Sequence, residues 1–293
     1  MNIADLFKKK TVFSFEVFPP KKESGVETIY KTLEELKQLN PDFISVTYGA
    51  GGVGVANATT VDLCSKIKNE YGIETIAHLT CLYNTKEDID RILEELKENH
   101  DVVITIEDGI LDGGFGEKIS RFYDFRYASE LTEYIMSKNM GFNVSGGCYP
   151  EVHQEAESMI ADIKNLKKKI DAGADHLISQ LFFDNNAFYD FIEKVRIAGI
   201  DVPIEAGIMP VTNKKQIERM VSMCGASIPA KLSKVLQRFG DNPEAMRDAG
   251  ISYAIDQIID LVANGVEGIH IYTMNDPYIA GKITKSVESI IKN

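Results

Sequence analysis

Residues 158–179, SMIADIKNLKKKIDAGADHLIS, contain the local pattern that decides the fold. The first sixteen residues place apolar side chains three and four positions apart, as an amphipathic helix does, and Gly173 stands where such a helix ends. The short apolar run at 176–179 follows at once and is typical of a buried strand. A helix that leads directly into a buried strand is the repeating unit of parallel α/β proteins.

The same alternation runs through all 293 residues. Helical stretches such as IYKTLEELKQL (29–39) separate short apolar runs. Eight strands, each followed by a helix, predict an α/β fold of the (β/α)8 TIM barrel type. Segment 228–266 predicts two extra helices before the eighth strand, and the chain lacks a linker rich in Pro, Gly or Ser, so we expect 1–293 to form a single domain. The expected strands are 12–18, 43–47, 75–80, 102–106, 142–148, 176–179, 203–208 and 268–272.

Composition limits the classes of function that the protein can have. Hydrophobic residues make up 44% of the chain and charged residues 26%, which suits a large buried core. A net charge of −12 argues against a nucleic-acid binder. The start, MNIADLFKKK, has no apolar leader, and no run of about 18 apolar residues predicts a membrane span. No metal is expected, because the sequence has no HxH or HExxH motif and its cysteines are widely spaced. This spacing of Cys64, Cys81, Cys148 and Cys224 also favours a cytoplasmic, thiol-reduced protein.

In a barrel, the chemistry is expected at the C-terminal ends of the strands. Glu16 lies in FSFEVFPP (13–20), and burial among its apolar neighbours would raise its pKa and suit a general acid. The alternative is a carboxylate that pairs with a nearby lysine. His78 ends another strand, as either a structural or a catalytic residue. Gln180 stands beside two phenylalanines, where an amide could read a heterocycle or merely cap a loop.

Two further motifs could bind phosphate. Asp162, Asn165 and Lys169 share one face of the expected helix at 158–173, with Lys168 beside them. This face is either solvated or a groove that offers lysines to a pyrophosphate and a carboxylate to a ribose. GAGGVG (49–54) formally matches the dinucleotide motif GxGxxG. The residues NATT (57–60) delay the helix, and the next strand ends without an acid, so a glycine-rich barrel loop is the better interpretation.

Eight strings in this order resemble the methylenetetrahydrofolate reductase family and cover nearly the whole chain. They are FSFEVFPP (13–20), DFISVTYGAGG (42–52), IAHLTC (76–81), RYASEL (126–131), YPEVHQEA (149–156), NLKKKIDAGADHLISQLFFD (165–184), GIMPVTNKKQ (207–216) and HIYTMN (270–275).

The resemblance implies a barrel that binds FAD, takes hydride from NADH or NADPH, and passes it to methylenetetrahydrofolate to give methyltetrahydrofolate. It implies that Glu16 is the acid that helps open the methylene bridge and that Asp108 lies near flavin and pterin, with a catalytic role. Gln180, Gln216 and Asp108 match folate positions. The positions that match FAD contacts are Thr47, Tyr48, Ala50, His78, Asp108, Ala128, Tyr149, His153, Asp162, Asn165, Lys168 and Lys169.

The chain departs from the family pattern in four places. The string TIEDG (105–109) stands where the family has LRGD, so Ile106 and Glu107 replace an arginine and a glycine. Asp276 stands where a basic residue often meets folate carboxylates, Ala206 replaces a usual proline, and Met220 replaces an aromatic residue. These changes bear on FAD binding, folate affinity and the electron donor.

They leave two alternatives open: the same chemistry supplied with electrons by a partner subunit, and a flavin- or folate-binding subunit without turnover. The protein is therefore expected as a homo-oligomer or in complex with an electron-transfer subunit. A phosphate-binding barrel aldolase or synthase fits less well, because the expected seventh and eighth loops have no glycine-rich anion site.

Overall fold

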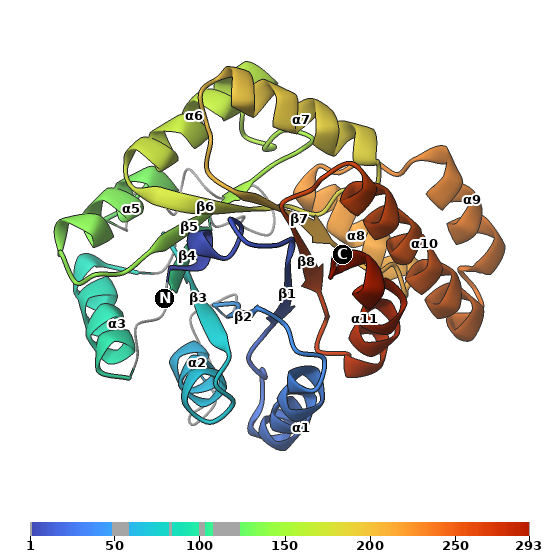
Figure 1. Ribbon diagram of the computed structural model, residues 1–293, viewed down its shortest axis with the longest axis horizontal. Helices are drawn as coiled ribbons and strands as arrows, with labels where there is room; N and C mark the ends of the chain where they lie inside the picture. Colours follow the sequence, from blue (N-terminus) through green and yellow to red (C-terminus); the bar gives the residue numbers. More distant parts are fainter. Residues whose placement is uncertain (1, 49–58, 82–83, 100–102, 108–123, 293) are drawn as a thin grey trace.

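The computed structural model describes residues 2–48, 59–81, 84–99, 103–107 and 124–292. Its strands are all parallel, each pairs with the next in chain order, and β1 also pairs with β8, so the sheet closes into a barrel (Figure 1). The α/β class and the parallel arrangement predicted from the sequence are confirmed. The strands are β1 (Val12–Val17), β2 (Phe43–Val46), β3 (Glu74–Thr80), β4 (Val103–Glu107), β5 (Val144–Cys148), β6 (Ala174–Ser179), β7 (Ile204–Ile208) and β8 (Gly268–Tyr272).

Helices surround this sheet (Figure 1). They are α1 (Val26–Lys37), α2 (Thr60–Asn69), α3 (Lys86–Asn99), α5 (Ala128–Ser137), α6 (Met159–Asp171), α7 (Asn185–Ile197), α8 (Lys214–Cys224), α9 (Ala230–Phe239), α10 (Pro243–Ala263) and α11 (Pro277–Ile291). The two extra helices predicted before the eighth strand are α9 and α10. None of the described helices is both long and apolar enough to cross a membrane.

The stretch that decides the fold behaves as its sequence predicts. Helix α6 has Ser158 as its N-cap, whose hydroxyl accepts a hydrogen bond from the backbone N–H of Ala161. Gly173 then adopts φ +120°, a left-handed conformation that favours glycine, and β6 begins at the next residue. The strand therefore starts two residues earlier than expected, because the turn after the helix is complete within Gly173.

Apolar side chains form one cluster between the strands and the helices and a second cluster at the N-terminal end of the barrel. Phe15 on β1 and Leu33 on α1 are fully buried where the outer face of the strands meets the helices, and each contributes roughly 1.5–3 kcal/mol. A smaller cluster closes the N-terminal end of the barrel, where the short helix η1 (Ile3–Asp5) and Phe7 pack against Val12 of β1 and Phe43 of β2. Among the described residues, this cluster closes the end of the barrel below the strands, opposite the C-terminal strand ends.

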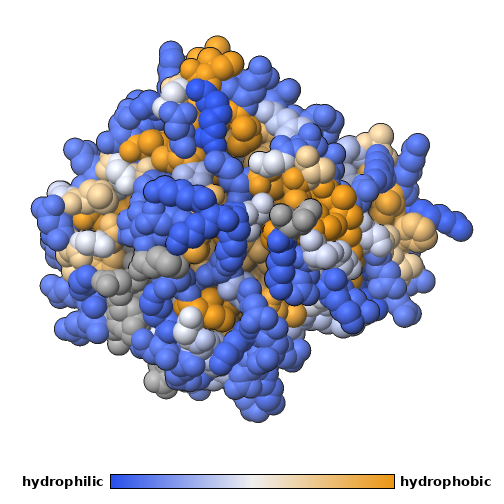
Figure 2. All heavy atoms as spheres, in the orientation of Figure 1, coloured by the Kyte–Doolittle hydropathy of each residue, from blue (hydrophilic) through white to orange (hydrophobic). Residues whose placement is uncertain are grey.

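The inner face of the sheet is not uniformly apolar. Alternate residues of each strand point to opposite faces, and the inward positions of several strands are polar and buried. They include Ser14, Ser45, Ser145, His176, Glu205 and His270, each with 0% exposure. The outer surface is mixed: the face in Figure 2 is mostly hydrophilic, with apolar residues interspersed. These polar side chains inside the barrel position the candidate active site.

Candidate active site

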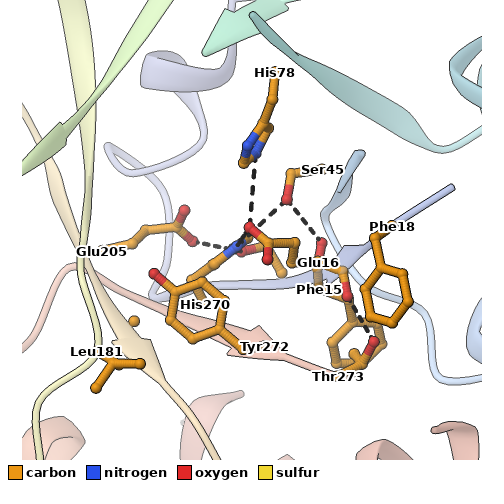
Figure 3. A network of polar contacts seen from close by, with 12 residues as sticks. Phe15, Glu16, Phe18, Ser45, His78, Leu181, Glu205, His270, Tyr272 and Thr273 are labelled. Carbon is orange, nitrogen blue, oxygen red and sulfur yellow. Dashed lines mark hydrogen bonds and ion pairs between the residues drawn. The ribbon is translucent and has the colours of Figure 1, made fainter. Parts of the chain in front are cut away.

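Glu16 is the central side chain at the open end of the barrel. It projects from β1 into the interior, where its Oε2 lies 3.7 Å from Nε2 of His78 on β3 and 3.7 Å from Nε2 of His270 on β8 (Figure 3). Both histidines are buried, with 2% and 0% of their side chains exposed, whereas Glu16 keeps 16%. A carboxyl group between two imidazoles, itself within reach of a ligand, can hold or release a proton there.

The apolar setting predicted for Glu16 is wrong. Phe13, Phe15 and Val17 belong to the core that packs against the helices, whereas Glu16 shares the inner face with Ser14. The reason is the two-residue period of a strand, which turns sequence neighbours away from one another. The groups that face Glu16 are therefore imidazoles and not phenyl rings.

The end of β1 is held in place by the loop that follows β8. Thr273 donates a hydrogen bond from Oγ1 to the carbonyl oxygen of Glu16 at 2.6 Å. Asn275 accepts from the backbone N–H of Phe18 at 3.0 Å and donates to its carbonyl at 2.8 Å. Asn275 itself has φ +56°, a left-handed conformation that asparagine tolerates better than most residues. These contacts fix the backbone from which Glu16 projects.

A cavity of about 320 Å³ adjoins this loop. Its lining includes the cations Lys21 and Lys22, the hydroxyl groups of Ser24 and Thr28, and Asn275. Neither lysine forms an ion pair with another described residue. The cavity therefore places two lysines without an ion-pair partner among the described residues a few positions from Glu16 in the sequence, which suits a ligand with a carboxylate tail.

A second group of predicted residues lies between β5 and α6. Asp162 accepts a hydrogen bond through Oδ2 from the backbone N–H of His153 at 2.8 Å. The rings of Tyr149 and His153 meet edge to face, with their centroids 4.6 Å apart. Lys168 donates to Oδ1 of Asn165 at 3.0 Å on the exposed side of the helix. The structure thus brings five of the predicted cofactor residues together at one end of β5.

Lys169 extends from the same helix to the strand. It is buried, with 5% exposure, and its Nζ donates to the carbonyl oxygen of Gly147 at 3.0 Å. Its stem fills the space over Gly146, where a Cβ would lie 2.6 Å from Cδ of Lys169. A Cβ at Gly147 would meet no described atom within 4 Å. Inside the barrel mouth, β5 therefore borders open space, with a buried ammonium group beside it.

On β7 the interior is closed. A Cβ at Gly207 would lie 2.1 Å from the carbonyl oxygen of Ser179 and 2.7 Å from the hydroxyl of Tyr272. That hydroxyl donates to the same carbonyl at 2.7 Å. The barrel mouth is consequently filled on its β7–β8 side and open on its β5 side.

Two of the remaining predicted cofactor residues follow β2. Thr47 donates its backbone N–H to the carbonyl oxygen of Val17 at 2.9 Å. Tyr48 donates its hydroxyl to Oδ1 of Asn84 at 3.4 Å, and burial raises the pKa of this phenol, which keeps it a neutral donor. Ala128 is fully buried as the first residue of α5.

The two described residues that are predicted to contact folate follow β6 and β7 in the chain. Gln180 follows β6 and accepts a hydrogen bond through Oε1 from the backbone N–H of Leu181 at 2.9 Å. Gln216 lies in the first turn of α8, where its backbone N–H donates to Oδ1 of Asn213 at 3.1 Å. Ala50 and Asp108 lie outside the described residues, as does the glycine-rich stretch 49–54.

The departures from the family pattern have partial structural explanations. Asp276 is the N-cap of α11, and its Oδ1 accepts from the backbone N–H of Ile279 at 3.2 Å, which accounts for an acid at this position. Ala206 is fully buried on the outward face of β7. Met220 packs against an apolar cluster that includes Leu181 and Phe183.

The sequence reasoning missed the buried polar residues inside the barrel. Ser14 bridges Glu205 and His270, and His270 in turn faces Glu16 (Figure 3). The signal was available: a polar residue at every second position of a strand marks one face as polar. Within the described residues, no group of three or more His, Cys, Asp or Glu side chains could hold a metal ion.

Comparisons with known proteins agree on one family. The family model described as methylenetetrahydrofolate reductase matches residues 2–288. "Methylenetetrahydrofolate reductase (NADH) 1" of Arabidopsis thaliana is 35% identical over 310 residues, which cover 100% of this chain and 50% of the plant protein. "5,10-methylenetetrahydrofolate reductase" of Escherichia coli K12 is 36% identical over 262 residues, or 89% of this chain and 86% of the bacterial one. The chain thus spans about half the length of the plant relatives and most of the bacterial one.

Among solved structures, a Clostridium thermocellum protein has a similar fold. It matches with a TM-score of 0.71 and 16% sequence identity, over 98% of each chain. That protein is described as binding two copies of 5-methyl-5,6,7,8-tetrahydrofolic acid. At this identity the match supports the fold alone.

Proposed function

The chain belongs to the methylenetetrahydrofolate reductase family, and from this premise we propose that it reduces 5,10-methylenetetrahydrofolate to 5-methyltetrahydrofolate, with FAD as cofactor and NADH or NADPH as electron donor. The observation that carries the proposal is the position of Glu16, an acid between two buried histidines at the C-terminal end of the barrel strands. A barrel that only bound folate would have no evident use for that arrangement.

In the proposed reaction Glu16 acts as the general acid. Protonation of a nitrogen of the methylene bridge from the Glu16 carboxyl opens the bridge to an iminium, which then accepts hydride. His78 and His270 hold the carboxyl in the mouth, and Thr273 and Asn275 hold its backbone. A general acid in such a position contributes roughly a hundredfold to ten-thousandfold to the rate.

The residues near β5 fit FAD. The open space at Gly147 can take a planar ring, and Lys169 places a buried cation beside it. Lys168, on the exposed side of α6, can meet a pyrophosphate, and Asp162 a ribose hydroxyl. FAD, when bound, supplies the hydride-transfer chemistry that no side chain can supply. Thr47, Tyr48, His78, Tyr149, His153 and Asn165 would complete the contacts, with Ala50, Asp108 and Ala128 proposed from their matching positions.

The folate substrate would lie between this space and the lysine cavity. Gln180 at the end of β6 and Gln216 on α8 are proposed to contact its pterin end, together with Asp108. Lys21 and Lys22 are placed to meet the carboxylates at its other end. They offer positive charge near the position where Asp276 caps a helix instead of supplying a cation.

We also propose that residues 1–293 form a single domain, a complete (β/α)8 TIM barrel, in a cytoplasmic enzyme. Pairing of β1 with β8 supports the first part and four free cysteines support the second. The oligomeric state is proposed to be a homo-oligomer, or a complex with an electron-transfer subunit if NAD(P)H does not reduce the flavin.

The test begins with the absorbance spectrum of the purified protein, which should show bound flavin. Glu16→Gln should retain flavin and its reduction by NAD(P)H but lose folate reduction by about a hundredfold or more. Glu27→Gln is the matched control, because Glu27 is an exposed carboxylate on α1 paired with Lys31. Full activity of Glu16→Gln would exclude the proposed acid, and a protein that cannot be loaded with FAD would exclude the reductase. A flavin that NAD(P)H does not reduce would favour the partner subunit as donor.

A further inference from the structure

A chain of buried polar groups runs from the closed end of the barrel to Glu16. Nδ1 of His176 on β6 lies 2.7 Å from Oγ of Ser145, and its Nε2 lies 3.3 Å from Oε2 of Glu205 on β7. The hydroxyl of Ser14 on β1 donates to Oε1 of Glu205 at 2.9 Å and lies 2.7 Å from Nδ1 of His270. All five side chains are within 1% of full burial.

Among the described residues, Glu205 is the only fully buried carboxyl group. A buried carboxylate is costly unless it is paired and hydrogen-bonded. The Ser14 hydroxyl donates to Oε1 of Glu205, and Nε2 of His176 lies 3.3 Å from Oε2 without a hydrogen bond between them. Phe7 packs on the ring of His176 with centroids 4.9 Å apart, which closes the pair off from the N-terminal end.

The single proton of Ser14 gives the chain a direction. A serine hydroxyl can donate one hydrogen bond only, and Ser14 donates it to Glu205. In its short contact with His270, the Nδ1–H group of the imidazole must then donate to the Ser14 hydroxyl oxygen. Nδ1 of His270 therefore has a proton, and in the neutral ring Nε2 has the lone pair. Nε2 is the nitrogen that faces Glu16 at 3.7 Å (Figure 3).

We propose that Glu205, acting through Ser14, is a positioning residue that fixes the tautomer of His270 with its lone pair toward Glu16. The proposal deepens the proposed function, because Glu16 is the acid of that reaction. A lone pair on Nε2 presents a hydrogen-bond acceptor toward Glu16, whereas an N–H there would present a donor. At 3.7 Å the two groups interact electrostatically, beyond hydrogen-bond distance.

Other groups around the two residues leave this assignment intact. Glu16 also faces His78, whose Nε2 lies 3.7 Å from the same oxygen. Nε2 of His270 is 3.4 Å from the hydroxyl of Ser45, which donates to the carbonyl oxygen of Phe15 at 3.5 Å. Both contacts are long, so they constrain the ring less than the 2.7 Å and 2.9 Å contacts of Ser14. The remaining neighbours of the ring are aromatic: Phe43 is stacked and Tyr272 is edge-on, with centroids 6.1 Å and 5.4 Å away. The short contacts of the ring therefore run through Ser14 to Glu205.

The test determines which of the two ring nitrogens of His270 is protonated. Full-length protein labelled with ¹⁵N-histidine is titrated between about pH 5 and pH 9, and the His270 signals are assigned by their loss in His270→Asn. In the neutral ring of the wild type we expect the proton on Nδ1. Ser14→Ala should remove this preference, whereas Ser45→Ala, which deletes a hydroxyl at the other nitrogen, should keep it.

A neutral wild-type ring protonated on Nε2 would overturn the proposal, as would an unchanged tautomer in Ser14→Ala. If Ser14→Ala fails to fold, the wild-type reading and Glu205→Leu decide the question in the same way. Folate reduction in Ser14→Ala should fall about tenfold at neutral pH, with its pH profile displaced and flavin reduction by NAD(P)H unchanged. Because the tautomer is read without substrate or cofactor, a protein with the expected tautomer and no reductase activity would sink the proposed function and leave this inference standing.

Discussion

Two glycines on the inner face of the barrel provide a sharp test of where the cofactor space lies. Gly147 on β5 and Gly207 on β7 are both inward-facing, and neither has a positive φ, so a side chain at either position strains only its surroundings. The surroundings differ greatly. A Cβ at Gly147 meets no described atom within 4 Å, whereas a Cβ at Gly207 would lie 2.1 Å from the carbonyl oxygen of Ser179.

The expected stabilities follow from these distances. Gly147→Ala should leave the unfolding free energy unchanged or raise it by up to about 1 kcal/mol, because the unfolded chain loses freedom. Gly207→Ala should lower it by about 3 kcal/mol, since a backbone carbonyl must move to relieve the contact, and this corresponds to a fall in Tm of roughly 5–10 °C. Thermal and denaturant unfolding of the two variants measures the difference.

The functional half of the prediction uses a larger side chain. Gly147→Val should fold as stably as the wild type, but its methyl groups would occupy the space proposed for the flavin ring. Overpacking costs about 1–3 kcal/mol, so the Kd for FAD should rise by roughly fivefold to a hundredfold. The assay is titration of the apoprotein with FAD, followed by flavin fluorescence. A folded Gly147→Val that binds FAD with wild-type affinity would refute the placement of the cofactor beside β5.

Three further predictions concern the cavity, a helix cap and the alkaline limit. Lys21→Ala with Lys22→Ala should raise the KM for folate about threefold to tenfold without changing kcat, because two exposed charges are lost; equal KM values for the variant and the wild type would exclude the cavity. Asp276→Ala should lower the unfolding free energy by about 1 kcal/mol, whereas Asp276→Ser should retain most of it, since serine also caps helices. Burial and the hydrogen bond to Asp260 raise the pKa of Tyr189 to about 12, so its stabilisation is complete below pH 10 and is lost as the pH rises toward 12. Tyr189→Phe should therefore lose less stability than the wild type between pH 10 and pH 12 in denaturant unfolding.

The strand positions could be predicted from the sequence because their signals are local. The run at 268–272 and the turn at Gly173 each depend on neighbours within a few residues, and both were placed correctly. The start of β5 was placed two residues early, at 142, where Phe142 is apolar and buried but precedes the strand. A register shift between Val144 and Ser145 marks the irregular start of that strand, and hydrophobicity does not encode it.

The surroundings of Glu16 were harder to predict because they are made by distant segments. Glu16 and His270 are 254 positions apart, and only closure of the sheet through β1 and β8 brings them together. The residue itself could be singled out, but its neighbours along the chain gave the wrong surroundings. Asp276 shows the opposite case: Asp followed by Pro277 is a local helix-start signal, so its capping role was available from the sequence.

The constraints on Glu16 also define how a ligand can approach it. The carboxyl is held from below by His270, which Ser14 and Glu205 orient, and its backbone is held from the side by the loop after β8. Tyr272 fills the mouth toward β7. Two spaces remain among the described residues, the lysine cavity beside the loop after β8 and the space at Gly147 on β5. A substrate with a charged tail at one end and a ring to be reduced at the other fits the function that we propose, with its tail at the lysines and its ring toward the space at Gly147.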